Sequence, residues 1–216
     1  MRWINQIERA VKQRQFIDSH KAVTGLFVLG LIALYGQWRN PAAWVYLALH
    51  GSYGILWVWK SRVFPDKSWE QLATWRFALL AWGGLSIYWV APWLLISHGA
   101  EPVPWRMALC VGLVMVGVFL HFASDMQKHM WLKLQPGKLL TDGLWSRVRN
   151  PNYLGELLIY LGFALLAMHW LPVALLAAFV LIYWLPNMRR KDRSLARYPE
   201  FAAYQRRTKL LIPFIF

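Results

Sequence analysis

The chain has 216 residues, 58% of them hydrophobic, and a formal net charge of +14 at pH 7. Soluble domains are typically about 45–50% apolar. Here the excess lies in long runs that contain almost no charge, which excludes an ordinary soluble globular protein. The single cysteine, Cys110, excludes an intramolecular disulfide. These features predict an all-α, polytopic membrane helix bundle.

The chain begins with a basic and polar segment, residues 1–21, which predicts a cytoplasmic amphipathic lead-in. Its apolar side chains recur near helical spacing, as in a helix that lies on a membrane surface: Trp3, Ile4, Ile7, Val11 and Phe16. Six apolar runs follow, each close to the length that a helix needs to cross about 30 Å of hydrocarbon. The predicted spans are about 22–38, 43–59, 77–96, 107–122, 154–168 and 171–185. The last two are short, so a tight helical hairpin and a partly re-entrant pair both remain open.

Basic residues alternate strictly between the segments that separate these spans. From the N-terminus the segments carry 5, 1, 4, 1, 5, 0 and 8 lysines and arginines. Because positively charged loops stay in the cytoplasm, both termini are predicted to lie inside. The alternation also explains the net charge through topology and lipid head groups, so we predict no nucleic-acid partner. We predict a single integral membrane domain, residues 1–216, in a bacterial inner membrane.

Polar residues gather where the fourth span reaches the cytoplasm. His121, Asp125 and His129 are spaced four residues apart, which places them on one face of a helix. Ionisable residues at membrane depth indicate a functional site. A metal site is one interpretation, but a polar face in head-group water explains the two histidines better, and we predict no metal ligand.

A second polar cluster, residues 143–156, leads into the fifth span. Asn150 is a candidate cap and Pro151 is favoured in the first turn of a helix. The free amides of that turn, together with Arg147 and Arg149, predict an anion site. Glu156 lies one turn inside the apolar helix, where a carboxylate requires a partner.

The tail combines basic and apolar residues after Tyr198 and Pro199. Such a segment can lie on a membrane surface, or it can fold over the phosphate of a cofactor.

At these positions the sequence resembles membrane reductases of the steroid 5-alpha-reductase type. The resemblance covers about residues 112–216 and rests on short motifs in the family's order: Ser124-Asp125, Pro136-Gly137-Lys138, Gly143-Leu144-Trp145, Asn152-Tyr153-Leu154-Gly155-Glu156, Tyr198-Pro199 and Leu211-Ile212-Pro213-Phe214-Ile215-Phe216. It implies a helical membrane fold that holds NADPH in a cytoplasmic cavity. Hydride would then pass to the double bond of a lipophilic enone.

The resemblance implies that the cofactor-binding half is residues 107–216, and that Asp125, Asn152 and Glu156 contact the cofactor. Arginines are added to the set by charge. The complete predicted cofactor-binding set is His121, Asp125, Arg147, Arg149, Asn152, Tyr153, Glu156, Arg190 and Tyr198.

Hydride transfer to an enone also needs an acid near the carbonyl oxygen. The family uses a tyrosine with a glutamate from its first half. In this sequence Gly51 or Ser52 stands nearest that tyrosine, and the neighbouring Tyr53 is the predicted substitute. Glu70 is the predicted acidic partner, with Asp66 as a further candidate.

Two alternatives remain open. The stretch from Arg149 to Tyr153 also resembles the isoprenylcysteine and phospholipid methyltransferases, which use S-adenosylmethionine. Those proteins carry a histidine where Asn150 stands and a pair of glutamates where Lys191-Asp192 stand. A non-catalytic membrane protein that keeps the fold is the second alternative. The expected partners are the lipid bilayer and a lipophilic small molecule, and the reductase is the preferred function.

Overall fold

The computed structural model describes residues 11–216, and this part of the chain is built of helices without an extended strand. Four of its helical segments are long and apolar enough to cross a membrane, namely Gln13–Leu34, Trp75–Ser97, Pro104–Leu134 and Trp170–Leu195. The protein is therefore an integral membrane helix bundle. Its contacts divide into two compact units, Met1–Cys110 with Phe163–Pro172, and Val111–Gly162 with Val173–Phe216.

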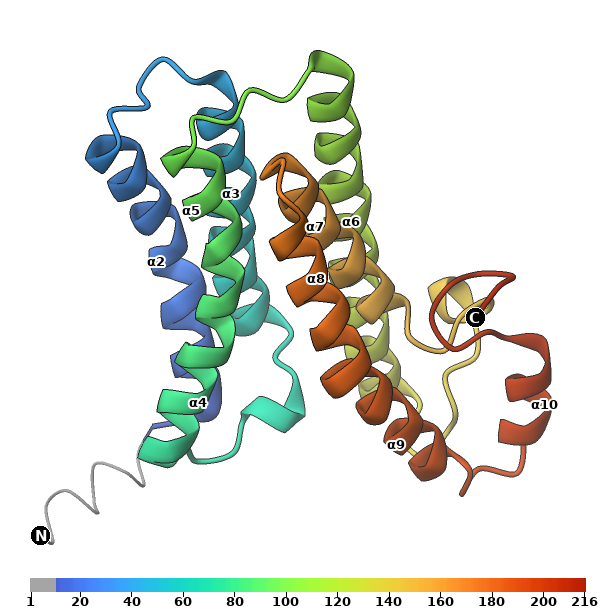
Figure 1. The fold of residues 1–216 in the computed structure, drawn as a ribbon. Coiled ribbons are helices and arrows are strands. Elements are labelled where there is room, and N and C mark those ends of the chain that lie inside the picture. The colour runs from blue at the N-terminus through green and yellow to red at the C-terminus, as the bar shows by residue number, and fades with distance from the viewer. Residues whose placement is uncertain (1–10) are drawn as a thin grey trace, which may run out of the picture. The chain divides into compact units, whose positions relative to one another are not determined.

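The first unit contains three long helical segments (Figure 1). They are α2 (Gln13–Leu34), α3 (Pro41–Val63) and a rod formed by α4 (Trp75–Ser86), η2 (Ile87–Trp89) and α5 (Val90–Ser97), with the short η1 (Lys67–Trp69) before α4. Asn40 caps α3 by accepting hydrogen bonds from the amides of Ala42 and Ala43, at 2.9 and 3.3 Å. Helices α2 and α3 pack closely because Gly54 lies against the backbone of Lys21.

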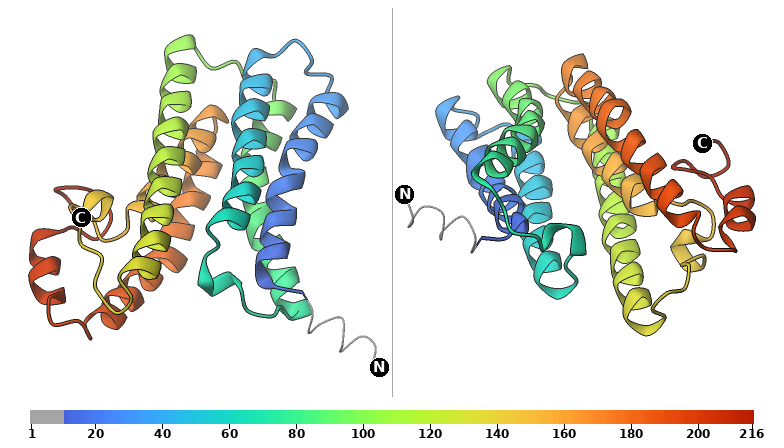
Figure 2. Two further views of the ribbon diagram at one scale, coloured as in Figure 1. Left: turned by 180° about the vertical axis from the view of Figure 1, so that it is seen from behind. Right: turned by 90° about the horizontal axis from the view of Figure 1, so that it is seen from below.

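The second unit contains most of α6 (Pro104–Leu134) and α7 (Pro151–Leu166), and the long rod of α8 (Trp170–Phe179), η4 (Val180–Trp184) and α9 (Leu185–Leu195). The loop helix η3 (Gly143–Trp145) and the tail helix α10 (Phe201–Arg207) complete it. Figure 2 shows α10 and the C-terminal segment beside the loop that leads into α7. This arrangement brings residues 145–150 and 204–210 together.

Small residues set the closest helix contact of the second unit. A Cβ atom added to Gly117 of α6 would lie 2.6 Å from the carbonyl oxygen of Gly155 in α7. A Cβ atom added to Gly155 would lie 2.4 Å from the backbone nitrogen of His121. The two backbones therefore touch directly, as small residues allow in membrane helices. The contact places His121 next to the first turns of α7.

The helices match the predicted spans in order but differ at their ends. Helix α2 begins at Gln13, so it includes residues 13–21 of the predicted lead-in. Residues 1–10 of that segment lie outside the described residues. Helix α6 continues to Leu134, twelve residues beyond the predicted end at 122, because its polar turns keep helical hydrogen bonding. The last rod continues to Leu195 instead of ending near 185. Pro186 donates no backbone hydrogen bond, and the π-helical η4 precedes it.

The two short segments at 154–168 and 171–185 are a helical hairpin. Helix α7 ends at Leu166 and α8 begins at Trp170. Met168, in the turn, has a positive φ of 55°, and the amide of Leu171 donates to Nδ1 of His169 at 3.0 Å. The turn is therefore closed by the polar residues that separate the two apolar runs. Helix α3 is 23 residues long but is not among the four segments apolar enough to span, and α7 has only 16 residues.

Candidate cofactor site

The entrance to α7 is fixed by Arg149, which is buried. Its Nε donates to both carboxylate oxygens of Asp192 in α9, at 3.2 and 3.0 Å. Its Nη1 donates to the carbonyl oxygens of Thr208 and Gln205, at 2.8 and 3.3 Å. Arg149 was predicted to bind a cofactor phosphate. The structure instead shows its guanidinium holding α9 and the tail against the start of α7.

Asn150 is completely buried and extends this connection. Its side-chain amide donates to the carbonyl oxygen of Leu210 at 2.9 Å, and its Oδ1 accepts from the ammonium of Lys191 at 2.9 Å. The same ammonium donates to the carbonyl oxygen of Arg149 at 3.0 Å. Asn150 therefore does not cap α7 with its side chain, as predicted, but joins the loop to the tail.

Tyr204 and Trp145 complete the support beneath the loop. The hydroxyl of Tyr204 donates to the carbonyl oxygen of Trp145 at 2.7 Å, and the indole of Trp145 donates to the carbonyl oxygen of Ser124 in α6 at 3.3 Å. Burial raises the pKa of Tyr204, so its hydroxyl remains a donor at neutral pH. Helix α6, the loop and α10 are thereby linked by hydrogen bonds.

On α6 the predicted polar face lies inside a continuous helix. His121 is buried, its Nδ1 lies 3.1 Å from the carbonyl oxygen of Asn152, and its Nε2 lies 3.8 Å from Oδ2 of Asp125. The structure thus brings together three of the predicted site residues, His121, Asp125 and Asn152. Within residues 11–216 no group of three or more His, Cys, Asp or Glu side chains could hold a metal ion.

Two acceptors on α7 stand out because the protein does not satisfy them. Oδ1 of Asn152 is buried, and no residue between 11 and 216 donates a hydrogen bond to it. Glu156, four residues later on the same face, has no hydrogen-bond or ion-pair partner in that part of the chain. A buried acceptor without a donor costs about 1–3 kcal/mol, which applies to the Asn152 oxygen, whereas the half-buried Glu156 carboxylate can reach water. Both atoms are therefore suited to a ligand that brings its own donors.

The remaining predicted residues of the second unit surround this entrance. Arg147 and Arg190 are exposed, and neither side chain has a partner in the described part of the chain. The ring of Tyr153 packs edge-on against Trp184 with centroids 5.4 Å apart. Tyr198 packs against the cluster of Leu139, Phe201 and Tyr204 and stacks under the guanidinium of Arg197. Tyr198 therefore supports α10.

The two predicted catalytic residues lie in the first unit, in different surroundings. Tyr53 is buried, and the ammonium of Lys21 lies 4.8 Å from the centre of its ring. Glu70 forms ion pairs with Lys12 and Arg14. The hydrogen bond from Lys12 lowers the pKa of Glu70, which keeps this carboxylate charged. Glu70 is thus bound to the start of α2, and Tyr53 contacts a lysine that we did not predict.

The supporting residues Lys191, Asp192, Tyr204 and Thr208 were also not predicted as part of the site. One signal for Asp192 was present in the sequence, because it is a lone acid among the basic residues of 189–193. The ion pair with Arg149 explains why a single acidic residue stands in this basic segment. Tyr204 and Thr208 carry no comparable signal.

Residues 66–208 match the family model described as "Protein of unknown function (DUF1295)". The chain belongs to this family. It is also 35% identical over 124 residues to the cobalt-zinc-cadmium resistance protein CzcN of Cupriavidus metallidurans. The matched region covers 56% of each protein, so the chain spans just over half the length of this relative. The family match includes Asp125, Arg149, Asn152 and Glu156.

Proposed function

We propose that this protein is a membrane-embedded, NADPH-dependent reductase of a carbon–carbon double bond in a lipophilic enone. The observation that carries the proposal is the buried, unsatisfied Oδ1 of Asn152, with the half-buried carboxylate of Glu156 one turn later on α7. It agrees with the resemblance of this segment to the steroid 5-alpha-reductase type.

The chemistry of these residues fits a dinucleotide. The ribose hydroxyls and the nicotinamide carboxamide of a dinucleotide are hydrogen-bond donors. They could donate to Glu156 and to Oδ1 of Asn152. Arg147 and Arg190 are exposed cations whose guanidinium groups suit phosphate oxygens. Arg149 is not assigned to the phosphates, because its Nε and Nη1 already donate to Asp192 and to the tail.

When bound, NADPH would supply the hydride for one carbon of the double bond. The residues of this chain would orient it: Asn152 accepts from an amide, Glu156 accepts from hydroxyls, and His121 fixes the backbone at Asn152. The reaction also consumes one proton, which is assigned to Tyr53 by the family resemblance alone. The bilayer is the expected route for the substrate, and the site is proposed to face the cytoplasm.

Methyl transfer from S-adenosylmethionine is a second candidate, favoured by one observation. Arg149 donates to Asp192, and the second unit carries two further carboxylates, Asp125 and Glu156, and the aromatic ring of Tyr153. Carboxylates and aromatic rings suit a sulfonium cation.

The test is thermal unfolding of the detergent-purified protein with NADPH or S-adenosylmethionine. A ligand that binds only the folded state stabilises it by about 2.7 kcal/mol at 100 times its dissociation constant. We expect a shift with NADPH that is lost in Asn152→Ala and Glu156→Gln. Asn150→Ala is the matched control, because this asparagine supports the loop: it should lower the unfolding temperature without ligand and keep the NADPH shift. A shift with S-adenosylmethionine alone would replace the reductase by the methyltransferase.

A further inference from the structure

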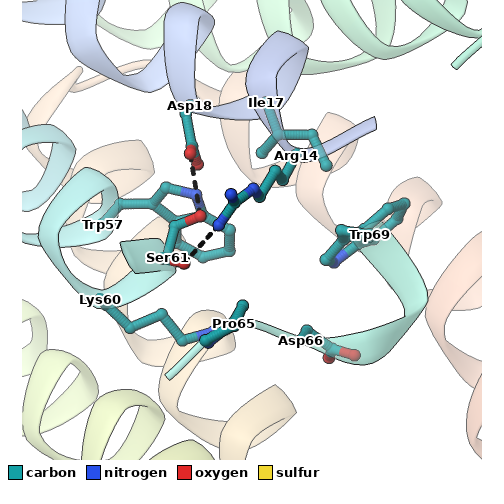
Figure 3. A pocket seen from close by; sticks show the side chains of 9 residues that line it. All are labelled: Arg14, Ile17, Asp18, Trp57, Lys60, Ser61, Pro65, Asp66 and Trp69. Atoms are coloured by element: carbon teal, nitrogen blue, oxygen red, sulfur yellow. Dashed lines mark hydrogen bonds between the residues drawn. The ribbon is translucent and has the colours of Figure 1, made fainter. Parts of the chain in front are cut away.

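The small pocket of the first unit is lined by groups that pair with one another. Figure 3 shows Ser61 of α3 between Asp18 and Arg14 of α2. The hydroxyl of Ser61 donates to Asp18 at 2.9 Å, and its carbonyl oxygen accepts from Arg14 at 3.3 Å. Arg14 also forms an ion pair with Glu70. This pocket is therefore part of the packing of the first unit, and the surface of the second unit differs from it.

Residues 211–216 of the second unit, here called the tail loop, form a closed curl with an apolar tip. The amide of Leu211 donates to the carbonyl oxygen of Phe216 at 2.7 Å, which closes the loop. At the tip, Phe214 and Ile215 are 80% and 77% exposed, and Phe216 is 45% exposed. Within the described part of the chain, these three large apolar side chains are left largely uncovered.

The backbone of Phe214 gives a second indication that this tip has a role. Its φ is 67°, which lies in the left-handed region that glycine, asparagine and aspartate enter most readily. An aromatic residue adopts this conformation at a cost in free energy. Because the side chain is 80% exposed, packing within the protein does not offset that cost. Insertion of the ring into an apolar phase would offset it.

The segment that carries the tail loop is fixed at the depth where the last long helix leaves its apolar part. Arg149 donates both to Asp192 of α9, at 3.0 Å, and to the carbonyl oxygen of Thr208, at 2.8 Å. Asp192 lies about 10 Å beyond Leu185, the end of the apolar run, at a helical rise of about 1.5 Å per residue. The head-group layer occupies roughly 5–8 Å on each side of the hydrocarbon. Thr208 therefore lies close to the head groups.

The charge around the tail loop has one sign. Arg206, Arg207 and Lys209 are exposed, and residues 201–216 include no acidic residue. An apolar tip with a basic flank is typical of segments that insert at an anionic membrane surface. A second copy of the chain would bring the same positive charges and be repelled. The phosphate of a soluble cofactor would pair with the cations but would leave the apolar tip in water.

We propose that the tail loop is a membrane anchor that inserts Phe214, Ile215 and Phe216 into an anionic leaflet of the bilayer. The exposed cations of residues 206–209 bind the phosphates of the surrounding lipids. This role does not depend on the proposed reductase. Because Thr208 is bonded to Arg149, lipid contact at the tail loop also holds the loop that leads into α7.

The test measures the depth of a nitroxide spin label attached at Ile215→Cys in a Cys110→Ala background. The protein is placed in liposomes made of equal parts of phosphatidylcholine and phosphatidylglycerol. Molecular oxygen concentrates in hydrocarbon and a nickel chelate stays in water, so the two relaxing agents distinguish lipid from solvent. We expect oxygen to relax the label at residue 215 more strongly than nickel does. Gln205→Cys, exposed on α10, is the matched control and should show the reverse order.

Two changes should move the label at residue 215 toward water. One is the use of phosphatidylcholine alone, and the other is the double variant Arg206→Gln with Arg207→Gln in the mixed liposomes. A label that neither change moves would overturn the assignment to anionic lipid. A label relaxed mainly by nickel in the mixed liposomes, or shielded from both agents, would overturn the insertion. Spin–spin broadening that disappears on dilution with unlabelled protein would replace the lipid by a second copy of the chain.

Discussion

At the scale of one residue, the charge of Arg149 stabilises the fold instead of contacting a ligand. Its guanidinium is buried, and it bonds to both oxygens of Asp192 and to two backbone carbonyls of the tail. Arg147, two positions earlier, is exposed and has no partner within residues 11–216. The sequence places both arginines in a motif that suggests phosphate binding. Only the fold separates their roles, because Asp192 lies 43 residues away along the chain.

The first prediction concerns this ion pair. The side chains of Arg149 and Asp192 are 8% and 13% exposed, so Asp192→Ala would leave a buried cation without its carboxylate. Such a loss costs about 3–5 kcal/mol. We expect the free energy of unfolding, measured by denaturant titration in mixed micelles, to fall by that amount. Asp142→Ala, at an exposed loop position, should change it by less than about 0.5 kcal/mol. Similar effects of the two changes would contradict the assigned role.

The second prediction concerns Glu70 and pH. Hydrogen bonding from Lys12 lowers the folded-state pKa of Glu70 below its ordinary value of 4.5. A carboxylate with a lowered pKa contributes stability that is present above the ordinary value and is lost as the pH falls through the folded value. The unfolding temperature should therefore fall between about pH 4.5 and more acidic values, and Glu70→Gln should weaken that dependence. An identical pH profile for the two proteins would refute the coupling.

At the scale of helices, the apolar runs predicted the order of the long segments but not their ends, and four of the segments are long and apolar enough to span. Helix α6 continues past Asp125 because polar residues form helical hydrogen bonds as readily as apolar ones once the helix is nucleated. The hydropathy pattern predicts where a segment leaves the hydrocarbon layer, but the helix itself can continue beyond that point. The candidate face of His121 and Asp125 was predictable from spacing, whereas the unsatisfied state of Asn152 was not.

The third prediction tests the contact between α6 and α7. In Gly117→Ala the new methyl group would lie 2.6 Å from the carbonyl oxygen of Gly155 and 2.8 Å from the backbone nitrogen of Ile159. Backbone atoms cannot move aside cheaply, so we expect a loss of at least about 1–3 kcal/mol.

Gly112→Ala provides the comparison on the same helix, because no atom lies within 4 Å of its added Cβ. It should be neutral, or stabilising by up to about 1 kcal/mol, since alanine favours helices. Both variants are compared by denaturant titration. Equal stability of the two proteins would show that the helices separate easily at Gly117.

For the whole molecule, the alternation of basic loops predicts the orientation of the helices in the membrane. Two of the loops that decide it, around Lys67 and Glu101, are exposed in the first unit. The division into two units was not predicted, because Phe163–Pro172 joins the first unit although it follows α6 in the chain. Contacts between distant segments leave no local pattern in a sequence.

The fourth prediction measures this orientation with single cysteines in a Cys110→Ala background. A membrane-impermeant thiol reagent added to intact bacterial cells should label Glu101→Cys. It should label Lys67→Cys only after the membrane is permeabilised, since basic loops stay in the cytoplasm. Labelling of Lys67→Cys in intact cells would invert the topology and would place the proposed cofactor site on the outer side.

The connection between the α7 entrance and the tail has a consequence for biosynthesis. Asn150 bonds to Leu210 across 60 residues, and Arg149 bonds to Thr208 across 59. The chain is made from its N-terminus, so these two residues must enter the membrane region before their partners exist. Until then, water or lipid head groups must satisfy them. The entrance to α7 is therefore among the last parts to become ordered, after the apolar helices have been inserted.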